Sequence, residues 1–361
     1  MTHIFVIHKD KLQYIPPVVS VCLILRDLGY EVTLIDEGVS QNLKEVFQNR
    51  KITMIEIPRH SSSRKPLILM MSYFVFRRKV FKYLKSEATD QSLLWIEGGH
   101  TLTSLGSIIK KYKYVLQISE LYEMAKVHFK SIGKVINGAQ AVFLPEFNRS
   151  ILYQVWFKLD KRPLLLPNKP YFIPTTKELE SLREKYKKQL NQLEGKKVVL
   201  FMGHIRNITN YIIALKEMGS EYQMLLVGHG NRIISKWKEI DSSIIFIDFI
   251  PAPDYLVFAS CAHIGILSYK PNSLNNVFCA PNKLYEYSAF GVPMIGNKIP
   301  GLIYTMEYAG AGMTVDEDNV EEIKKAIKMI DNNYSEFRKR AYEFYCAADN
   351  KKTISDAIKS I

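Results

Sequence analysis

The stretch PNKLYEYSAFGVPMIGNKIPG, residues 281–301, predicts a helix that leads into a buried strand. Asn282 lies at the start of the helix, and Gly291 ends it before the apolar run 292–296. A helix joined to an apolar strand by a glycine turn is typical of parallel α/β sheets.

Apolar runs of strand length recur throughout the chain, and helical segments lie between several of them. They occupy residues 4–7, 31–35, 53–57, 93–96, 114–118, 141–144, 197–202, 222–227, 244–247 and 263–267. This alternation predicts two doubly wound, Rossmann-like α/β domains. Ligands bind where the carboxyl ends of such strands meet, so we expect a nucleotide in a cleft shared by the domains.

Proline-rich sequence at LPNKP, residues 166–170, marks the expected domain boundary, because the strand pattern starts again at residue 197. We therefore predict an N-terminal domain over 1–170 and a second domain over 171–335. A helical segment over 336–361 could pass back to the first domain.

The charge is unevenly distributed: the chain carries +13, and residues 1–170 carry 25 Lys and Arg against 14 Asp and Glu. A nucleic acid, an anionic membrane or a phosphorylated acceptor would each suit such a basic half. No nucleic-acid-binding motif is visible, so we expect no nucleic acid partner. There is no signal-peptide pattern and the longest uncharged apolar run is 67–76, which favours a cytoplasmic protein. The four cysteines form no CxxC pair and predict neither zinc nor disulfides.

The motifs of the second half resemble those of retaining GT-B glycosyltransferases, in particular glycosyltransferase family 4. The resemblance is carried by FMGHIRN (201–207), LLVGHGN (225–231), the segment 244–271 and above all 281–301. It is looser in the first half, at ISELYE (118–123), 141–157 and 164–170. It implies a GT-B fold with two domains facing a central cleft, of which the first is on the acceptor side. It also implies a hexosyltransferase that moves sugar from a UDP- or GDP-type donor to a glycan or lipid-linked acceptor, as in capsule, O-antigen and exopolysaccharide synthesis.

The donor site is expected around the helix that begins near Asn282. Helix amino ends attract diphosphates, and Lys283 adds a positive charge there. The family's second glutamate, here Glu286, grips the two ribose hydroxyls, and Phe249 and Ile250 lie where backbone groups cradle the base. The expected nucleotide-sugar-binding residues are Gly203, His204, Gly228, His229, Gly230, Phe249, Ile250, Asn282, Leu284 and Glu286.

Four residues are predicted to act in catalysis: Arg206, Lys283, His100 and Glu120. Arg206 and Lys283 would stabilise charge on the departing diphosphate. His100 stands where relatives use a histidine to touch the donor sugar. A surface arginine and an ordinary loop histidine are the competing interpretations of Arg206 and His100. No DxD triplet is present, so we expect no metal and no cofactor.

Two positions depart from the family pattern. Phe278 replaces the earlier glutamate that approaches the sugar, and Asn275, Asn276 or backbone groups near Cys279 and Ala280 are possible substitutes. Pro16-Pro17 replaces a glycine pair after the first strand, which predicts a stiffer acceptor loop.

The segment 64–85 interleaves apolar residues with Arg77, Arg78, Lys79 and Lys82. Such a segment can lie at an anionic membrane surface, with its charges at the headgroups. We expect peripheral association with the inner face of the cell membrane. An ordinary core helix with a solvated basic end is the alternative.

Other functions remain open. A nucleotide-sugar epimerase of the same fold would also hold the diphosphate, and a degenerate GT-B binding subunit would fit the missing glutamate. A dehydrogenase is disfavoured because no GxGxxG follows the first strand.

Overall fold

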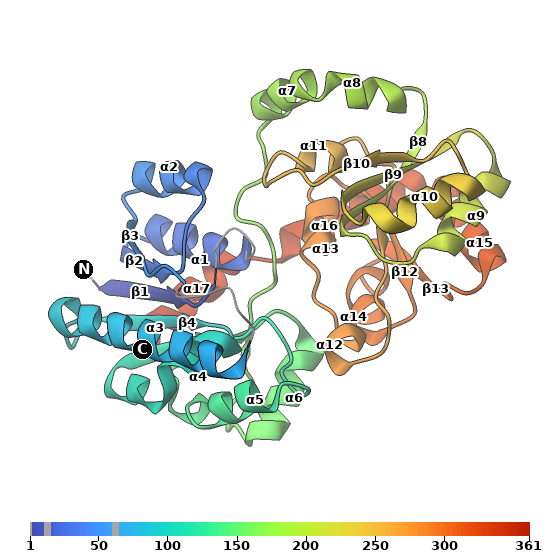
Figure 1. Cartoon of the computed structure of the whole chain (residues 1–361). Coiled ribbons are helices and arrows are strands. Elements are labelled where there is room, and N and C mark those ends of the chain that lie inside the picture. Colours follow the sequence, from blue (N-terminus) through green and yellow to red (C-terminus); the bar gives the residue numbers. More distant parts are fainter. Residues whose placement is uncertain (1, 11–15, 60–64) are drawn as a thin grey trace. The chain divides into compact units, whose positions relative to one another are not determined.

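The computed structural model describes residues 2–10, 16–59 and 65–361, which form two compact units (Figure 1). Unit 1 comprises Met1–Tyr171 and Asp349–Ile361, and unit 2 comprises Phe172–Ala348. Each unit is built on one parallel sheet covered by helices, which confirms the prediction of two doubly wound α/β folds.

Unit 1 contains a seven-stranded sheet in the order β3-β2-β1-β4-β5-β6-β7. Its strands are β1 (His3–His8), β2 (Glu31–Asp36), β3 (Thr53–Glu56), β4 (Leu93–Glu97), β5 (Lys113–Gln117), β6 (Val142–Leu144) and β7 (Leu164–Leu165). Strand β1 pairs with β2 and β4, and all its residues from Ile4 onward are buried. Continuous burial on both faces explains why β1 appears in the sequence as an uninterrupted apolar run.

Helices cover both faces of this sheet. They are α1 (Pro16–Asp27), α2 (Gln41–Asn49), α3 (Pro66–Glu87), α4 (Gly99–Leu105), α5 (Lys126–Gly133), α6 (Phe147–Phe157) and α17 (Asn350–Lys359), with 3-10 turns η2 (Gly106–Lys111) and η3 (Ile136–Gly138). Helices α1 and α17 pack together on one face, and α3, α4 and α5 follow one another on the other (Figure 1).

Unit 2 contains a six-stranded sheet in the order β10-β9-β8-β11-β12-β13. Its strands are β8 (Lys197–His204), β9 (Tyr222–His229), β10 (Ile245–Ile247), β11 (Ile264–Leu267), β12 (Met294–Asn297) and β13 (Gly312–Val315). Successive side chains of β8 enter opposite core clusters: Val198 and Leu200 lie in one, and Val199 and Phe201 lie in the other.

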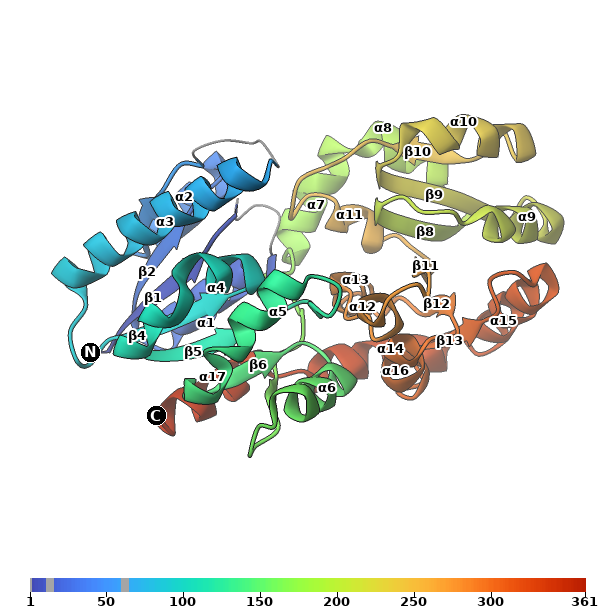
Figure 2. The same ribbon diagram turned by 60° about the horizontal axis from the view of Figure 1, so that its bottom comes forward.

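The helices of unit 2 complete those two clusters. They are α7 (Thr176–Lys185), α8 (Lys187–Leu190), α9 (Thr209–Met218), α10 (Asn231–Ile240), α11 (Leu256–Ala259), α12 (Leu274–Val277), α13 (Asn282–Ser288), α14 (Pro300–Leu302), α15 (Val320–Asn332) and α16 (Tyr334–Ala347), with the 3-10 turn η4 (Asn191–Leu193) and the π-helical turn η5 (Ile303–Glu307). Helices α9 and α15 pack side by side on one face (Figure 2), and α11, α13 and α16 contribute to the core on the other.

The chain leaves unit 2 for unit 1 after α16. Sequence reasoning began the C-terminal segment at residue 336, whereas the structure keeps all of α16 in unit 2. Ile354 of α17 is fully buried in the core of unit 1, and Asn350 Nδ2 donates a hydrogen bond of 2.8 Å to the carbonyl oxygen of Pro167.

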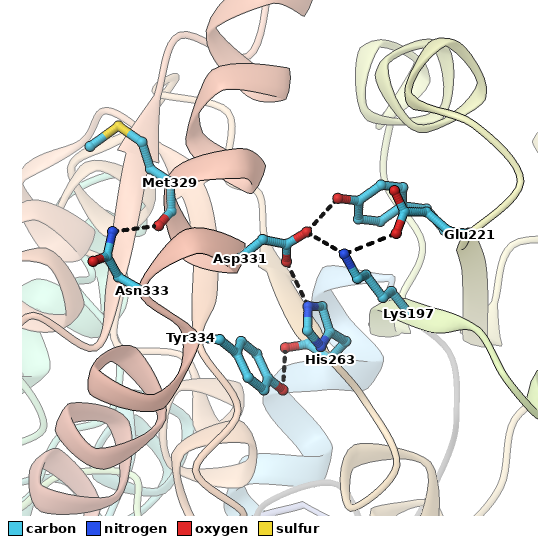
Figure 3. A network of polar contacts seen from close by, with 8 residues as sticks. Lys197, Glu221, His263, Met329, Asp331, Asn333 and Tyr334 are labelled. Carbon is cyan, nitrogen blue, oxygen red and sulfur yellow. Dashed lines mark hydrogen bonds and ion pairs between the residues drawn. The ribbon is translucent and has the colours of Figure 1, made fainter.

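A polar network fastens the amino ends of three unit 2 strands to the carboxyl end of α15 (Figure 3). Asp331 accepts hydrogen bonds from Lys197 Nζ at 2.9 Å and from the Tyr222 hydroxyl, and its other oxygen lies 2.6 Å from His263 Nε2. The ring of His263 stacks on Tyr334 with centroids 4.0 Å apart. Burial opposes ionisation of Asp331, but the three partners hold its pKa below the usual value.

Within the described residues, no helix has the length and hydropathy that crossing a lipid bilayer requires.

Candidate functional site

Two glycines meet at the carboxyl end of the unit 2 sheet, where β8 pairs with β9. Gly203 lies opposite Gly228, and both have positive φ, of 93° and 145°. A Cβ on Gly228 would lie 1.9 Å from the carbonyl oxygen of Gly203. Only residues without side chains can approach each other this closely, and at this crossing Gly203 is exposed whereas Gly228 is buried.

Lys283, in the first turn of α13, lies against this crossing. A Cβ on Gly203 would be 3.3 Å from its Nζ, and the ammonium sits 5.1 Å from the centroid of the Phe201 ring. Burial lowers the pKa of Lys283 to about 8; nearby Glu286 opposes this shift and Arg206 adds to it. The site therefore holds two cations close enough to influence one another.

Glu286 is the next polar residue on α13 and is 5% exposed. The Tyr255 hydroxyl donates a hydrogen bond to its Oε1. Burial raises the pKa of Glu286, although the Tyr255 hydrogen bond and the charge of Lys283 counteract the rise. A carboxylate held this way can accept from ligand hydroxyls. Sequence reasoning missed Tyr255, because nothing in PAPDYLVF indicates that its hydroxyl reaches α13.

Two aromatic rings lie at the carboxyl ends of the neighbouring strands β9 and β10. The rings of His229 and Phe249 are stacked, with centroids 4.5 Å apart and planes 11° from parallel, and Phe249 is 52% exposed. The Ile250 and Leu284 side chains are core residues instead, so any contact they make with a ligand falls to their backbone groups.

The remaining predicted donor-site residues lie around the same sheet edge. His204 is exposed at the end of β8, Asn282 opens α13, and a Cβ on Gly230 would come 2.7 Å from Ile205. Of the proposed substitutes for the missing glutamate, Asn276 donates through Nδ2 to Asn272 at 2.8 Å.

A polar cavity of about 630 Å³ opens beside this cluster at the carboxyl ends of β8, β11, β12 and β13. Arg206 lines it, together with Ser268, Asn297 and Glu317. Burial raises the pKa of Glu317 to about 7, although hydrogen bonds from Ser268 and Tyr211 pull it down. Sequence reasoning predicted none of the three residues that line the cavity together with Arg206.

His100 of unit 1 is part of a group of aromatic residues. Its Nδ1 lies 2.8 Å from the Tyr73 hydroxyl, and its ring centroid is 4.2 Å from that of His128. Desolvation lowers the pKa of both histidines, that of His128 to about 4. The pair is therefore neutral near pH 7 and suited to hydrogen bonding.

Glu120 is exposed and lies 3.8 Å from the guanidinium of Arg149. Arg149 also donates its backbone N–H to Glu146, the cap of α6, at 2.9 Å. This arrangement gives Glu120 a local structural partner, while its carboxylate stays open to solvent.

A buried pair that sequence reasoning missed joins the ends of β1 and β4. His8 Nδ1 lies 2.8 Å from Glu97 Oε2, and Ser119 donates to the other oxygen of Glu97 at 2.9 Å. Burial disfavours the charged imidazole, but Glu97, Asp10 and Asp36 together raise the pKa of His8. Only its position at a strand end could have indicated this contact.

The basic residues of α3 differ in exposure. Arg78, Lys79 and Lys82 are exposed, whereas Arg77 is partly buried and lies near Gly106. Toward the start of the same helix, four large apolar side chains face solvent, with exposures of 56% to 76%: Leu67, Met70, Met71 and Phe74. Arg64, at the start of the predicted membrane segment, falls outside the described residues.

Among the described residues, no three His, Cys, Asp or Glu side chains converge as metal ligands would. The carboxylate of Asp254, an acidic residue of the second unit, forms an ion pair with Lys185 Nζ at 2.6 Å.

Comparisons with known proteins agree with this geometry. Residues 184–333 match the protein family described as "Glycosyl transferases group 1". An uncharacterized glycosyltransferase of Haemophilus influenzae is 22% identical over 339 residues, which is 87% of this chain and 85% of that protein.

Solved structures share the fold over the whole chain. The Anabaena protein HepE, crystallised with UDP and glucose, superposes with a TM-score of 0.73 at 12% identity and covers 100% of both chains. A glycosyltransferase from Rickettsia africae gives a TM-score of 0.69 at 13% identity, covering 99% of this chain and 97% of that one. With two parallel sheets and a group 1 domain in its second unit, the chain is a glycosyltransferase with the GT-B fold.

Proposed function

We propose that this glycosyltransferase moves a hexose from a UDP- or GDP-sugar to a glycan or lipid-linked acceptor, with retention and without a metal, in surface polysaccharide synthesis. The observation that carries the proposal is that Lys283 lies against the Gly203–Gly228 crossing, within electrostatic range of Arg206 and Glu286. Two cations beside exposed backbone suit a diphosphate, and a buried carboxylate suits the ribose hydroxyls. The UDP and glucose bound to HepE are consistent with such a donor.

In the proposed reaction, the bond between the sugar C1 and the diphosphate oxygen breaks, and the oxygen leaves with the electron pair. Arg206 and Lys283 stabilise the charge that develops there, which lowers the barrier without a metal. The acceptor hydroxyl forms the new bond to C1 on the same face and passes its proton to the departing diphosphate oxygen. His100 would contact the donor sugar, and Glu120 would offer a second polar group.

The test is a transfer assay with UDP- and GDP-hexoses and polyprenyl-linked or free glycan acceptors, in the presence of EDTA. We expect sugar transfer from one donor class, and NMR of the product should show retained anomeric configuration. Loss of activity in EDTA that Mg²⁺ restores would contradict metal independence.

Two alternatives rest on specific features. An epimerase would convert the donor sugar in the absence of acceptor, which NMR of donor alone would reveal. Phe278, which replaces the family's first glutamate, favours a non-catalytic subunit; such a protein would bind UDP or GDP and turn over only with a co-purified partner.

The proposal includes attachment to the inner face of the cell membrane through α3. Its first turns expose Leu67 and Phe74, and its later turns expose Arg78 and Lys82. Apolar side chains can enter the interface while cations meet anionic headgroups.

Flotation with phosphatidylglycerol vesicles tests this attachment, with phosphatidylcholine vesicles as the comparison. We expect binding to anionic vesicles that is lost on replacing Arg78, Lys79 and Lys82 by glutamine. Replacing Lys110, Lys111 and Lys113, three exposed residues in and after η2, by glutamine is the control for the same change of net charge. Equal loss in the control would show that α3 has no special role.

A further inference from the structure

Tyr269 lies in the loop that follows β11 and is held by a side chain of the next strand. Asn297 ends β12 and is 7% exposed. Its Oδ1 accepts a hydrogen bond of 3.0 Å from the Tyr269 N–H, and its Nδ2 donates one of 2.6 Å to the Tyr269 carbonyl oxygen. One amide therefore satisfies both backbone groups of Tyr269, as a paired strand would.

The preceding residue is fixed independently. Ser268 is buried and donates through its hydroxyl to Glu317 at 3.0 Å, while the Tyr211 hydroxyl lies 3.2 Å from the other carboxylate oxygen. Glu317 follows β13 and Tyr211 belongs to α9, so the start of the loop is held from two further elements. The position of Tyr269 is thus determined by contacts on both sides.

The ring of Tyr269 contacts the guanidinium of Arg206. The guanidinium carbon lies 4.7 Å from the ring centroid, within the range of a cation–π contact. Arg206 itself belongs to an irregular segment between β8 and α9, which gives a long side chain little intrinsic order. Within the described parts of the chain it forms no ion pair with a carboxylate, so the ring orients the charge without neutralising it.

We infer that Tyr269 and Asn297 are positioning residues for Arg206, an inference that rests on the proposed function. A guanidinium lying on a ring keeps its in-plane N–H donors free for phosphate oxygens. The two hydrogen bonds of Asn297 fix the backbone of Tyr269, and the Tyr269 ring contacts Arg206, which lies within electrostatic range of Lys283. Tyr269 and Asn297 then affect the reaction only through Arg206.

A double-mutant cycle tests this dependence. Tyr269→Ala should lower kcat/KM by about fivefold to tenfold, the scale of a partly buried cation–π contact, and Tyr269→Phe should retain activity because the ring remains. In an Arg206→Ala background, Tyr269→Ala should have no further effect. Independent, additive effects of the two substitutions would overturn the inference.

A second measurement is independent of turnover. In ¹⁵N-labelled protein, the Arg206 Nε–H resonance, assigned by its loss in Arg206→Lys, should carry a ring-current shift. That shift should disappear in Tyr269→Ala and persist in Tyr269→Phe; an unchanged resonance in Tyr269→Ala would refute the stack. Asn297→Ala should reduce the ring-current shift. If Asn297→Ala does not fold, the comparison of Tyr269→Ala with Tyr269→Phe still tests the contact between the ring and Arg206.

A wild-type protein that neither binds UDP or GDP nor transfers sugar contradicts the proposed function. If the wild type is active but replacing Tyr269 changes neither the Arg206 resonance nor kcat/KM, only the positioning role is contradicted.

Discussion

Nucleotide binding should weaken with rising pH because the pKa of Lys283 lies near 8. Burial lowers this pKa, and Arg206 reinforces the shift by repulsion. A diphosphate bound beside the ammonium would favour its charged form and bring the pKa back toward its ordinary value. Binding then takes up a proton when the pH exceeds the pKa of the free site.

The size of the effect follows from the fraction of Lys283 that carries a proton. With a pKa of about 8, roughly nine-tenths is charged at pH 7 and roughly one-tenth at pH 9. If only the charged form binds, the affinity for UDP falls about tenfold over this range, or ~1.4 kcal/mol. Below pH 7 the lysine is already charged, so the affinity should level off.

Calorimetry with UDP and GDP between pH 7 and 9.5, in buffers of different ionisation enthalpy, measures both affinity and proton uptake. We expect uptake of about half a proton at pH 8. Lys283→Arg is the matched control, because a guanidinium stays charged throughout and should give a flat profile. Wild-type affinity that is constant from pH 7 to 9.5, or a slope that survives in Lys283→Arg, would refute the contact between Lys283 and the diphosphate.

Three other predictions concern single residues. Glu286→Ala should weaken UDP binding at least about tenfold, because it removes a charged acceptor for the ribose hydroxyls; unchanged calorimetric affinity would argue against that role. Gly228→Ala should destabilise the protein by about 2 to 4 kcal/mol in thermal unfolding. Gly219→Ala, which has positive φ but open space around the new Cβ, should lose only about 1 kcal/mol, and equal losses would show that the 1.9 Å approach is not the cause. Asp331→Asn should lower the Tm at pH 7, because the lowered pKa of Asp331 stabilises the fold above the ordinary carboxyl pKa. That difference should vanish as the pH falls through the lowered pKa, and a Tm difference independent of pH would exclude this explanation.

Most strands of both sheets could be predicted from the sequence because buried parallel strands leave continuous apolar runs. In β1 every residue from Ile4 onward is buried, and in β8 the residues from Val198 to Met202 are buried. The two-residue strand β7 escaped notice because it is too short and too exposed to leave such a run. The break at Asp349 was also missed, since α16 and α17 are both helical and nothing local distinguishes their units.

The contacts that organise the site could not be foreseen, because they join residues far apart in the chain. Tyr255 reaches Glu286 across 31 positions, and Asn297 reaches Tyr269 across 28. Local patterns indicate which residues end a strand or open a helix. Local patterns do not specify which hydroxyl or amide of another element will form a hydrogen bond with those residues.

The Asp331 network lies at the amino edge of its sheet, whereas the crossing of Gly203 and Gly228 lies at the carboxyl edge. One rim thus anchors the framework, and the other is the rim at which we propose that the donor binds. If that proposal holds, loops at the proposed donor rim can be exchanged to alter donor preference while the anchored rim keeps the sheet intact. An engineer could accordingly screen for new specificity and improve heat resistance at separate ends of the same strands.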